Sequence, residues 1–321
     1  MTAAVIAILG ATSHISKCLI SSFAQSGATE VHLFTRSPAM LTQFLAHECR
    51  EPRACLVVHD GYAEFSDHRY HVIINCVGVG TYTKLNGDFS LYFTVAEKYD
   101  NLVLGYLNSI NNNALYIAFS SGAVYGRGHD EPFDEDTVNY ISVNHLPKND
   151  YYAITRLYSE AKHRSYERLN IVDIRIFSFF SRYIDLNDGY FITELLDCIM
   201  NGRLLTTDAD NMMRDYLHPD DLHDLIMACM AAGRINTAFD AMSRQPVDKQ
   251  TVLDYFVSEN GLHYRVCADY SSSSSTGRKA VYYSKHNSAA AIGYSPKYSS
   301  LDTIRQEALQ LLRKPPATRC Q

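Results

Sequence analysis

The first half of the chain alternates short aliphatic and β-branched runs with longer amphipathic stretches. The runs that we interpret as strands are Val5–Leu9, Glu30–Thr35, Cys55–His59, Val72–Val77, Leu115–Ser120 and Ile171–Phe177. Stretches with helical periodicity lie between them, near residues 14–26, 38–49, 88–111 and 150–169. Strands that alternate with helices pair in parallel, so the sequence predicts an α/β fold with a Rossmann-like, doubly wound sheet. Ligands of such sheets bind beyond the carboxyl ends of the strands.

The second half has a looser pattern and predicts a smaller, mixed α/β unit. Helices are expected at Tyr190–Gly202, Pro219–Ala232 and Leu301–Leu312. The serine run Ser271–Ser275 should form a flexible loop. We expect residues 1–177 to form the sheet domain, with segments near 206–243 returning to it, and residues 178–321 to form most of the second domain.

Composition narrows the class of protein and its compartment. The chain has 321 residues, 46% of them hydrophobic and 20% charged, which is enough for a sizeable core. Its formal charge of −6 argues against nucleic acid or an anionic membrane as the main partner. No apolar run approaches the roughly 20 residues of a membrane helix, and the short run before residue 10 predicts a strand and not a signal peptide. The eight cysteines lack a Cys-x-x-Cys motif, so we expect reduced thiols in a cytoplasmic protein and no zinc or other metal site.

A glycine turn follows the first strand, in the sequence Gly10-Ala-Thr-Ser-His-Ile-Ser. Backbone N–H groups at the start of a helix bind pyrophosphate, so we expect Gly10, Thr12, Ser13, His14 and Ile15 to contact a dinucleotide. The alternative is an ordinary strand–helix turn, because serines occupy the places of the second and third glycines. Serine is small, but it allows the close approach of a ligand less freely than glycine does.

The ends of the second and third strands indicate which dinucleotide is bound. NAD-binding chains carry an acid at the end of the second strand, whereas this chain has Arg36 and Ser37 there. A guanidinium binds a 2′-phosphate through charge-assisted hydrogen bonds, so NADP(H) is favoured over NAD(H), the alternative being a solvated surface arginine. Asp60 and Gly61 follow the third strand and are expected near the adenine, although Asp60 is almost equally well explained as a turn residue.

Small residues follow the fourth strand. Cys76, Val77 and Gly78 are expected to contact the cofactor, and Gly80 and Thr81 the substrate. Glycines at this place let the backbone approach a ribose, or they simply form a turn.

The helix expected after residue 150 places a tyrosine and an arginine on one face. Tyr152, Arg156 and Glu160 are four residues apart, a spacing that aligns side chains along a helix. A fixed cation beside a phenol favours its ionised form, so the pair is suited to proton transfer. The alternative is a surface helix with an aromatic anchor and a solvated charge. Asn149 and Asp150 are the expected N-caps of this helix.

Two further polar positions complete the candidate site. The fifth strand runs into Ser121 and Gly122, which places a hydroxyl where a substrate of a parallel sheet would lie. Arg214 stands just before the helix predicted from Pro219, where it either holds a phosphate or belongs to a capping cluster.

Together these motifs resemble those of the extended short-chain dehydrogenases/reductases, the nucleotide-sugar epimerase/dehydratase family. The resemblance extends from about residue 4 to residue 312. The matching segments are Gly10-Ala-Thr-x-x-Ile, Asn101-Leu-Val-Leu-Gly105, Ser120-Ser-Gly-Ala-Val-Tyr-Gly126, Tyr152-x-x-x-Arg156-x-x-x-Glu160, Arg214-Asp-Tyr-Leu-His-Pro-Asp-Asp221 and Ile292-Gly-Tyr-x-Pro296. Four features depart from the family pattern. Arg156 replaces a lysine, Ser178-Phe-Phe-Ser181 replaces Asn-x-Tyr-Gly, serines replace the second and third glycines of the turn, and no acid follows the second strand.

The resemblance implies hydride transfer with Ser121, Tyr152 and Arg156 as the catalytic residues. Tyr152 would protonate the substrate oxygen, Ser121 would polarise the carbonyl, and Arg214 would bind the diphosphate of a sugar nucleotide. Because Arg36 favours NADPH, which net reductases commonly use, the leading prediction is an NADPH-dependent reductase of a nucleotide-linked 4-keto-6-deoxyhexose. The alternatives are a nucleotide-sugar epimerase or dehydratase with tightly bound cofactor, and a catalytically silent NADP-binding interaction protein.

The resemblance also implies a homodimer that pairs through the helices near 88–111 and 150–169. These stretches carry more apolar residues than one sheet-facing stripe needs, namely Leu91, Phe93, Val95, Leu102, Leu157 and Leu169.

Overall fold

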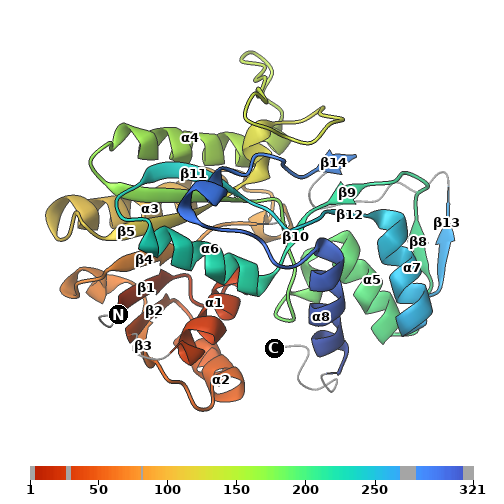
Figure 1. The fold of residues 1–321 in the computed structure, drawn as a ribbon, viewed down its shortest axis with the longest axis horizontal. Coiled ribbons are helices and arrows are strands. Elements are labelled where there is room, and N and C mark those ends of the chain that lie inside the picture. The colour runs from red at the N-terminus through yellow and green to blue at the C-terminus, as the bar shows by residue number, and fades with distance from the viewer. Residues whose placement is uncertain (1–3, 27–29, 81, 268–279, 314–321) are drawn as a thin grey trace.

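A seven-stranded parallel sheet forms the centre of the molecule, which we describe from a computed structural model (Figure 1). The model describes residues 4–26, 30–80, 82–267 and 280–313, so Thr81 and the serine run Ser271–Ser275 lie outside the described residues. The strands, in their spatial order, are β11 (Asn236–Ala241), β6 (Asn170–Ile176), β5 (Leu115–Ser121), β4 (Val72–Asn75), β1 (Val5–Leu9), β2 (Glu30–Thr35) and β3 (Cys55–Asp60). The chain reverses its direction of progress across the sheet between β1 and β4, which confirms the predicted doubly wound α/β class.

The six predicted strands are all present, with small shifts at their ends. The largest shift is in β4, which was predicted to reach Val77 but ends at Asn75. The Asn75 side chain accepts a hydrogen bond from the Val77 N–H at 3.0 Å and so turns the chain out of the sheet. The sequence did not reveal β11, which pairs with β6 at one edge.

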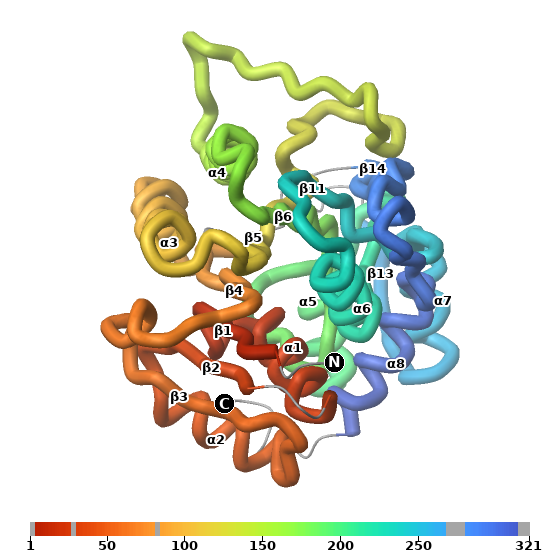
Figure 2. The backbone as a smooth tube through the Cα atoms, turned by 60° about the vertical axis from the view of Figure 1, so that its left-hand side comes forward, coloured from red at the N-terminus to blue at the C-terminus, as the bar shows by residue number. Residues whose placement is uncertain are grey.

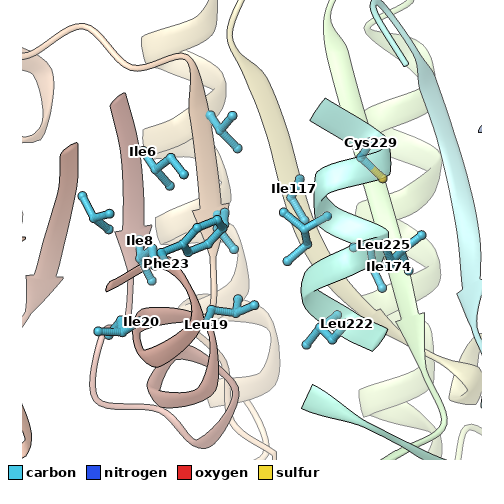
Figure 3. Packing of buried hydrophobic residues seen from close by; sticks show 14 of the residues in the cluster. Ile6, Ile8, Leu19, Ile20, Phe23, Ile117, Ile174, Leu222, Leu225 and Cys229 are labelled. Atoms are coloured by element: carbon cyan, nitrogen blue, oxygen red, sulfur yellow. The ribbon is translucent and has the colours of Figure 1, made fainter. Parts of the chain in front are cut away.

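Helices cover both faces of this sheet. Their bounds are α1 (His14–Gln25), α2 (Pro38–Glu48), α3 (Leu91–Ser109), α4 (Tyr151–Ser165) and α6 (Pro219–Ala231). Residues of β1 alternate between the faces: Ile6 and Ile8 belong to the core under α1 and α6, and Ala7 and Leu9 to the core under α3. Figure 3 shows α1 and α6 side chains gathered over the first of these faces. Figures 1 and 2 show α3 and α4 side by side on the opposite face.

The start of α4 lacks the side-chain capping hydrogen bond that the sequence predicts. A short 3₁₀ turn, Lys148–Asp150, leads directly into α4, and Asp150 has a helical backbone with no side-chain cap hydrogen bond. Its carboxylate pairs instead with Arg127. Asp150 is thus the N-cap residue of α4, as predicted, but its carboxylate forms an ion pair instead of a capping hydrogen bond, and Asn149 lies within the 3₁₀ turn.

A second unit, built mainly from the last third of the chain, packs beside the carboxyl ends of the central strands (Figure 1). Its helices are α5 (Phe191–Met200), α7 (Lys249–Asn260) and α8 (Ser300–Arg313). Its strands are β7 (Ser178–Phe179), β8 (Leu205–Thr207), β9 (Met213–Arg214), β10 (Tyr216–Leu217), β12 (Val247–Asp248), β13 (Tyr264–Val266) and β14 (Val281–Tyr282). Leu195, Phe256 and Ile304 bring the three helices together in one apolar core. The sequence had not predicted α7.

Shorter 3₁₀ turns connect these elements: Ala63–Asp67 (η1), Tyr82–Leu85, Gly122–Tyr125, Leu186–Asp188 and Ser288–Ile292. Within the described ranges, no helix has the length and apolarity that crossing a membrane requires. The seven cysteines in the described part of the chain form no disulfide.

Candidate functional site

A cleft of about 1360 Å³ separates the carboxyl ends of the central strands from the second unit. Twelve of the residues predicted for the site line it: Thr12, Ser13, His14, Ile15, Cys76, Val77, Gly78, Gly80, Ser121, Tyr152, Arg156 and Arg214. They come from the turns after β1 and β4, from the end of β5, from α4 and from β9, segments far apart in the sequence. The tertiary structure therefore gathers most of the predicted residues at one place.

Gly10 forms the base of the first turn without lining the cleft. Its φ is +72°, and a Cβ atom here would lie 3.0 Å from Val77 Cγ2 and 3.1 Å from the Cys76 carbonyl carbon. Glycine is thus required both by the backbone conformation and by the close approach of the turn after β4.

The serines of this turn bond to one another. Ser13 caps α1 by accepting from the Ser16 N–H at 3.2 Å, and the buried Ser16 hydroxyl lies 2.9 Å from the Gly10 carbonyl oxygen, to which it can donate. This cap provides an acceptor for one of the first N–H groups of the helix, which have no partner within the helix. The N-terminus of α1 still faces the cleft through Thr12, His14 and Ile15.

His14 makes a contact that the sequence did not predict. Its Nε2 lies 2.7 Å from the hydroxyl of Ser181, which also accepts from the Cys18 thiol at 3.1 Å. Burial, helped by nearby Lys17, lowers the pKa of His14 to about 3, so the ring is neutral at ordinary pH. Ser181, at the end of the segment that departs from the family pattern, thus holds a side chain of the turn after β1.

Ser121 and Tyr282 form a hydroxyl pair in the cleft. Ser121 is buried at the end of β5, and its Oγ lies 3.2 Å from the Tyr282 hydroxyl on β14. The same oxygen accepts from the Ala123 N–H at 3.2 Å. Tyr282 was missed by sequence reasoning, because nothing near residue 282 signals that β14 lies against β5.

Arg156 lies against the ring of Tyr152 on α4. Its guanidinium carbon is 5.1 Å from the centre of the tyrosine ring, and Nη1 donates to the Phe119 carbonyl oxygen at 3.1 Å. Nη2 would lie 2.8 Å from a Cβ on Gly78, so the arginine fills the space that this glycine leaves open. Arg156 Nε is buried and has no hydrogen-bond partner among the described residues. The cation is therefore held between the phenol ring and the turn after β4.

The other tyrosines of α4 lie elsewhere. Tyr151 packs on Phe89 and Phe93, with ring centres 6.3 and 6.0 Å away, and Tyr158 is 47% exposed. Neither lines the cleft, whereas Tyr152 does.

Glu160, the third residue of the predicted face, serves the fold. The buried carboxylate accepts from the Ser120 hydroxyl at 2.5 Å and binds Arg175 of β6 through two oxygens, the shortest contact being 2.7 Å. These bonds tie α4 to β5 and β6. The i, i+4, i+8 pattern thus places two side chains at the cleft and one in a buried ion pair.

Arg214 faces the cleft from the second unit. Nη1 donates to the Met213 carbonyl oxygen at 2.9 Å, and burial lowers the pKa of the guanidinium. Within the described ranges no carboxylate forms an ion pair with it, so a cation lines this wall uncompensated.

The residues predicted for the adenine end lie outside the cleft. Arg36, Ser37 and Asp60 are exposed at the ends of β2 and β3, and Gly61 is half-buried beside them. Their role in cofactor binding remains a prediction. Gly122 also lies behind the cleft, where it faces the Phe177 ring too closely to carry a Cβ.

Three solved structures agree with this architecture at low sequence identity. UDP-glucuronic acid 4-epimerase from Bacillus cereus is 17% identical, with a TM-score of 0.77 over 96% of this chain and 98% of that one. UDP-glucose 4-epimerase from Thermotoga maritima is 14% identical, with a TM-score of 0.77 over 95% and 98%. A dTDP-glucose 4,6-dehydratase from Streptomyces venezuelae is 17% identical, with a TM-score of 0.71 over 95% and 96%. These likenesses show the fold.

The family itself follows from the sequence model. No curated protein matches the chain by sequence. The model of the NAD dependent epimerase/dehydratase family matches residues 6–241, which include the glycine turn, Ser121, Tyr152 and Arg214. The match spans well over half of the chain, and it agrees with the strand order and the glycine turn. This chain therefore belongs to the NAD dependent epimerase/dehydratase family.

Proposed function

We propose that this protein is a nucleotide-sugar epimerase that oxidises and re-reduces a hexose carbon through a bound dinucleotide. One observation carries the proposal: Ser121 and Tyr152 line the same cleft as the N-terminus of α1 and the uncompensated Arg214. Two of the structural neighbours are 4-epimerases, of UDP-glucuronic acid and of UDP-glucose. They support the epimerase alternative over the net reductase that the sequence had favoured.

The residues of the first turn suit a dinucleotide. The closely packed Gly10, at positive φ, and the N-terminus of α1 make a cradle for a pyrophosphate. Gly78 and Arg156 would hold the ribose next to the reacting carbon, with the buried Arg156 Nε as a donor that has no partner among the described residues. When bound, the dinucleotide supplies a reversible hydride acceptor.

Tyr152 and Ser121 carry the proton chemistry in this proposal. Tyr152 removes the proton of the sugar hydroxyl and returns it, and the Ser121 hydroxyl donates to the same sugar oxygen. Tyr282 holds Ser121 in place through their 3.2 Å contact. Arg156 lies against the Tyr152 ring, with its guanidinium carbon 5.1 Å from the ring centre, and keeps a cation at this place in the cleft.

In this proposal the diphosphate of the substrate binds at Arg214. A half-buried cation without a carboxylate partner among the described residues is stabilised by a ligand that brings negative charge, as a diphosphate does. The cleft volume of about 1360 Å³ exceeds the roughly 300–1,000 Å³ of ordinary ligand pockets. A site that holds a dinucleotide and a sugar nucleotide together needs this larger volume.

The test is turnover of sugar nucleotides with each dinucleotide present. With UDP-glucose or UDP-glucuronic acid and NAD or NADP, an epimerase forms the 4-epimer, detected by NMR, without net change in NADH or NADPH absorbance. Loss of NADPH with a 4-keto sugar nucleotide would instead identify the reductase. Binding of both ligands without any product would identify the catalytically silent protein.

Three matched tyrosine variants test which phenol takes part in the chemistry. Tyr152→Phe should lower turnover by about 10²–10⁴-fold, the usual contribution of general acid–base catalysis, with little change in cofactor affinity. Tyr151→Phe and Tyr158→Phe, which alter phenols outside the cleft, should change turnover far less. Wild-type turnover by Tyr152→Phe would exclude the catalytic assignment.

A further inference from the structure

Three histidines gather at the outer edge of the central sheet, away from the cleft. They are His32 on β2, His59 on β3 and His68 just after η1. One ring nitrogen from each lies within 4.8 Å of the other two. His32 and His59 are buried, and His68 is half-buried at the end of its turn. The cluster therefore joins three segments that the sequence keeps apart.

Carboxylates hold the outer nitrogens of the two buried rings. His32 Nε2 lies 3.1 Å from Glu30 Oε1, and His59 Nδ1 lies 3.0 Å from Glu64 Oε2. Histidines that bind metals almost always donate their second ring N–H to a carboxylate, a carbonyl or water, which fixes the ring and leaves the inner nitrogen with a lone pair. Two such carboxylate–histidine pairs meet at this cluster.

The inner nitrogens face one another. His32 Nδ1 and His59 Nε2 are 2.9 Å apart. If both outer N–H groups donate to their carboxylates, both inner nitrogens present lone pairs across this distance, and only a proton or a cation between them removes the repulsion. The Phe34 ring stacks on His59 with ring centres 4.3 Å apart, which keeps this side of the cluster away from bulk water.

We propose that His32, His59 and His68 bind a transition-metal ion of the Zn²⁺ class, with Glu30 and Glu64 as the groups that orient the ligands. Neutral imidazole suits Zn²⁺, Co²⁺, Ni²⁺ and Cu²⁺. Two nitrogens of a tetrahedral zinc site, each about 2.05 Å from the metal, are about 3.3 Å apart. The His32–His59 pair then opens by a few tenths of an ångström, and the half-buried His68 turns inward to complete the set.

This proposal goes beyond the proposed function and revises the expectation of no metal site, which rested on cysteine spacing alone. The metal would clamp β2, β3 and the segment after η1. Asp60 and Gly61 follow His59 directly, so the clamp would fix the corner of the sheet predicted to hold the adenine. Its role is structural, because the cluster does not line the cleft.

The experiment is a metal titration of the full chain without an affinity tag and with its thiols kept reduced. We expect one equivalent of Co²⁺ to bind with the visible absorption of a tetrahedral site, Zn²⁺ to displace it, and the dissociation constant for Zn²⁺ to be on the order of 1 µM or lower. Glu64→Gln should weaken Zn²⁺ binding about 10–100-fold, as loss of an orienting carboxylate does. His68→Asn, which removes a ligand, should weaken it at least as much.

Matched variants distinguish this cluster from metal binding at surface side chains. His145→Asn removes an exposed histidine far along the chain, and Cys55→Ser removes an exposed thiol opposite Glu30 in the sheet; both should bind Zn²⁺ like the wild type. Glu64 is 67% exposed, so its variant tests the site even if a histidine variant fails to fold. Less than half an equivalent bound by the wild type, or unchanged affinity in Glu64→Gln and His68→Asn, would overturn the proposal.

Discussion

Arg156 is the residue that most separates this chain from the motif it otherwise follows. Its guanidinium packs on the Tyr152 ring, and one nitrogen is held by the Phe119 carbonyl oxygen. A lysine in this place would be a compact, mobile charge, whereas arginine is planar and anchored. The structure thus keeps a cation beside the phenol, but as a planar group fixed by the Tyr152 ring and the Phe119 carbonyl oxygen.

Substitutions at Arg156 should separate charge from shape. Arg156→Lys retains the cation and restores the family pattern, so turnover should be kept or raised. Arg156→Met removes the cation that packs on the Tyr152 ring and that would hold the ribose, so turnover should fall. Turnover of both variants under the conditions used for the wild type checks both expectations, and equal turnover of wild type and Arg156→Met would show that the charge plays no part.

Arg36 tests the choice of dinucleotide. The exposed guanidinium at the end of β2 should favour a 2′-phosphate, so wild type should bind NADP(H) more tightly than NAD(H). Arg36→Ala should lose about 1.5–3 kcal/mol of this preference, or roughly ten- to a hundredfold. Fluorescence titration of both cofactors measures it, with the exposed Arg50→Ala as a control that should keep the preference. If Arg36→Ala retained the wild-type ratio, Arg36 would not belong to the cofactor site.

At the scale of elements, buried ion pairs fasten α3 and α4 to the sheet. His163 of α4 lies 2.7 Å from Asp100 of α3 and 2.8 Å from Asp173 of β6, and Lys162 adds a 2.6 Å bond to Asp100. Burial alone would lower the pKa of His163, but its bonds to the two carboxylates outweigh burial and raise it to about 9. The charged histidine is thus an internal link between two helices and a strand.

This link makes the stability depend on pH in the alkaline range. The folded-state pKa of His163, about 9, lies above the ordinary value of 6.5, so its stabilisation is complete below pH 6.5 and is lost as the pH rises through 9. The free energy of unfolding, measured by denaturant titration, should therefore decrease as the pH is raised from 6.5 to 9. His163→Gln should be less stable than wild type at pH 6 and should show a smaller decline. An equal decline in both proteins would assign the pH dependence to other groups.

At the scale of the whole molecule, α3 and α4 present the face predicted to pair two copies. Leu91, Phe93, Val95, Leu102 and Leu157 are half-buried, but Val95 and Leu102 pack against the core under α3 and Leu157 against a second apolar cluster, and Leu169 lies in the core. Its inclusion in the predicted dimer face was wrong, since Leu169 follows the end of α4 and packs under the sheet. Tyr158 is the large apolar side chain of α4 that is exposed, at 47%.

We expect a homodimer built on this face. Light scattering should give about twice the chain mass of 36.2 kDa. Tyr158→Glu, which places a charge in the proposed interface, should shift the mass toward the monomer, whereas Val143→Glu, at an exposed site before α4, should not. A wild-type monomer at working concentration would contradict the prediction.

The sequence determined the central sheet and the side of the cleft that is formed by the carboxyl ends of its strands and by α4. Buried parallel strands are continuous apolar runs, so β1 to β6 were found within two residues at each end, and the residues that follow them meet because parallel strands end at one edge. β11, Asn-Thr-Ala-Phe-Asp-Ala, lacks such a run, and its place is set by pairing with β6. Local patterns predicted Tyr152, Arg156 and Ser121 at the cleft, and the structure places them there.

Only the tertiary structure decided the contacts between segments far apart in the chain. The pairing of Ser121 with Tyr282, of His14 with Ser181, and of Glu160 with Arg175 joins residues whose own neighbourhoods carry no sign of the partner. The same holds for His32, His59 and His68, which meet because β2 and β3 lie side by side and η1 folds back over them. Local periodicity records which face of an element is buried, whereas the partner of a buried polar group is fixed by how the elements pack together.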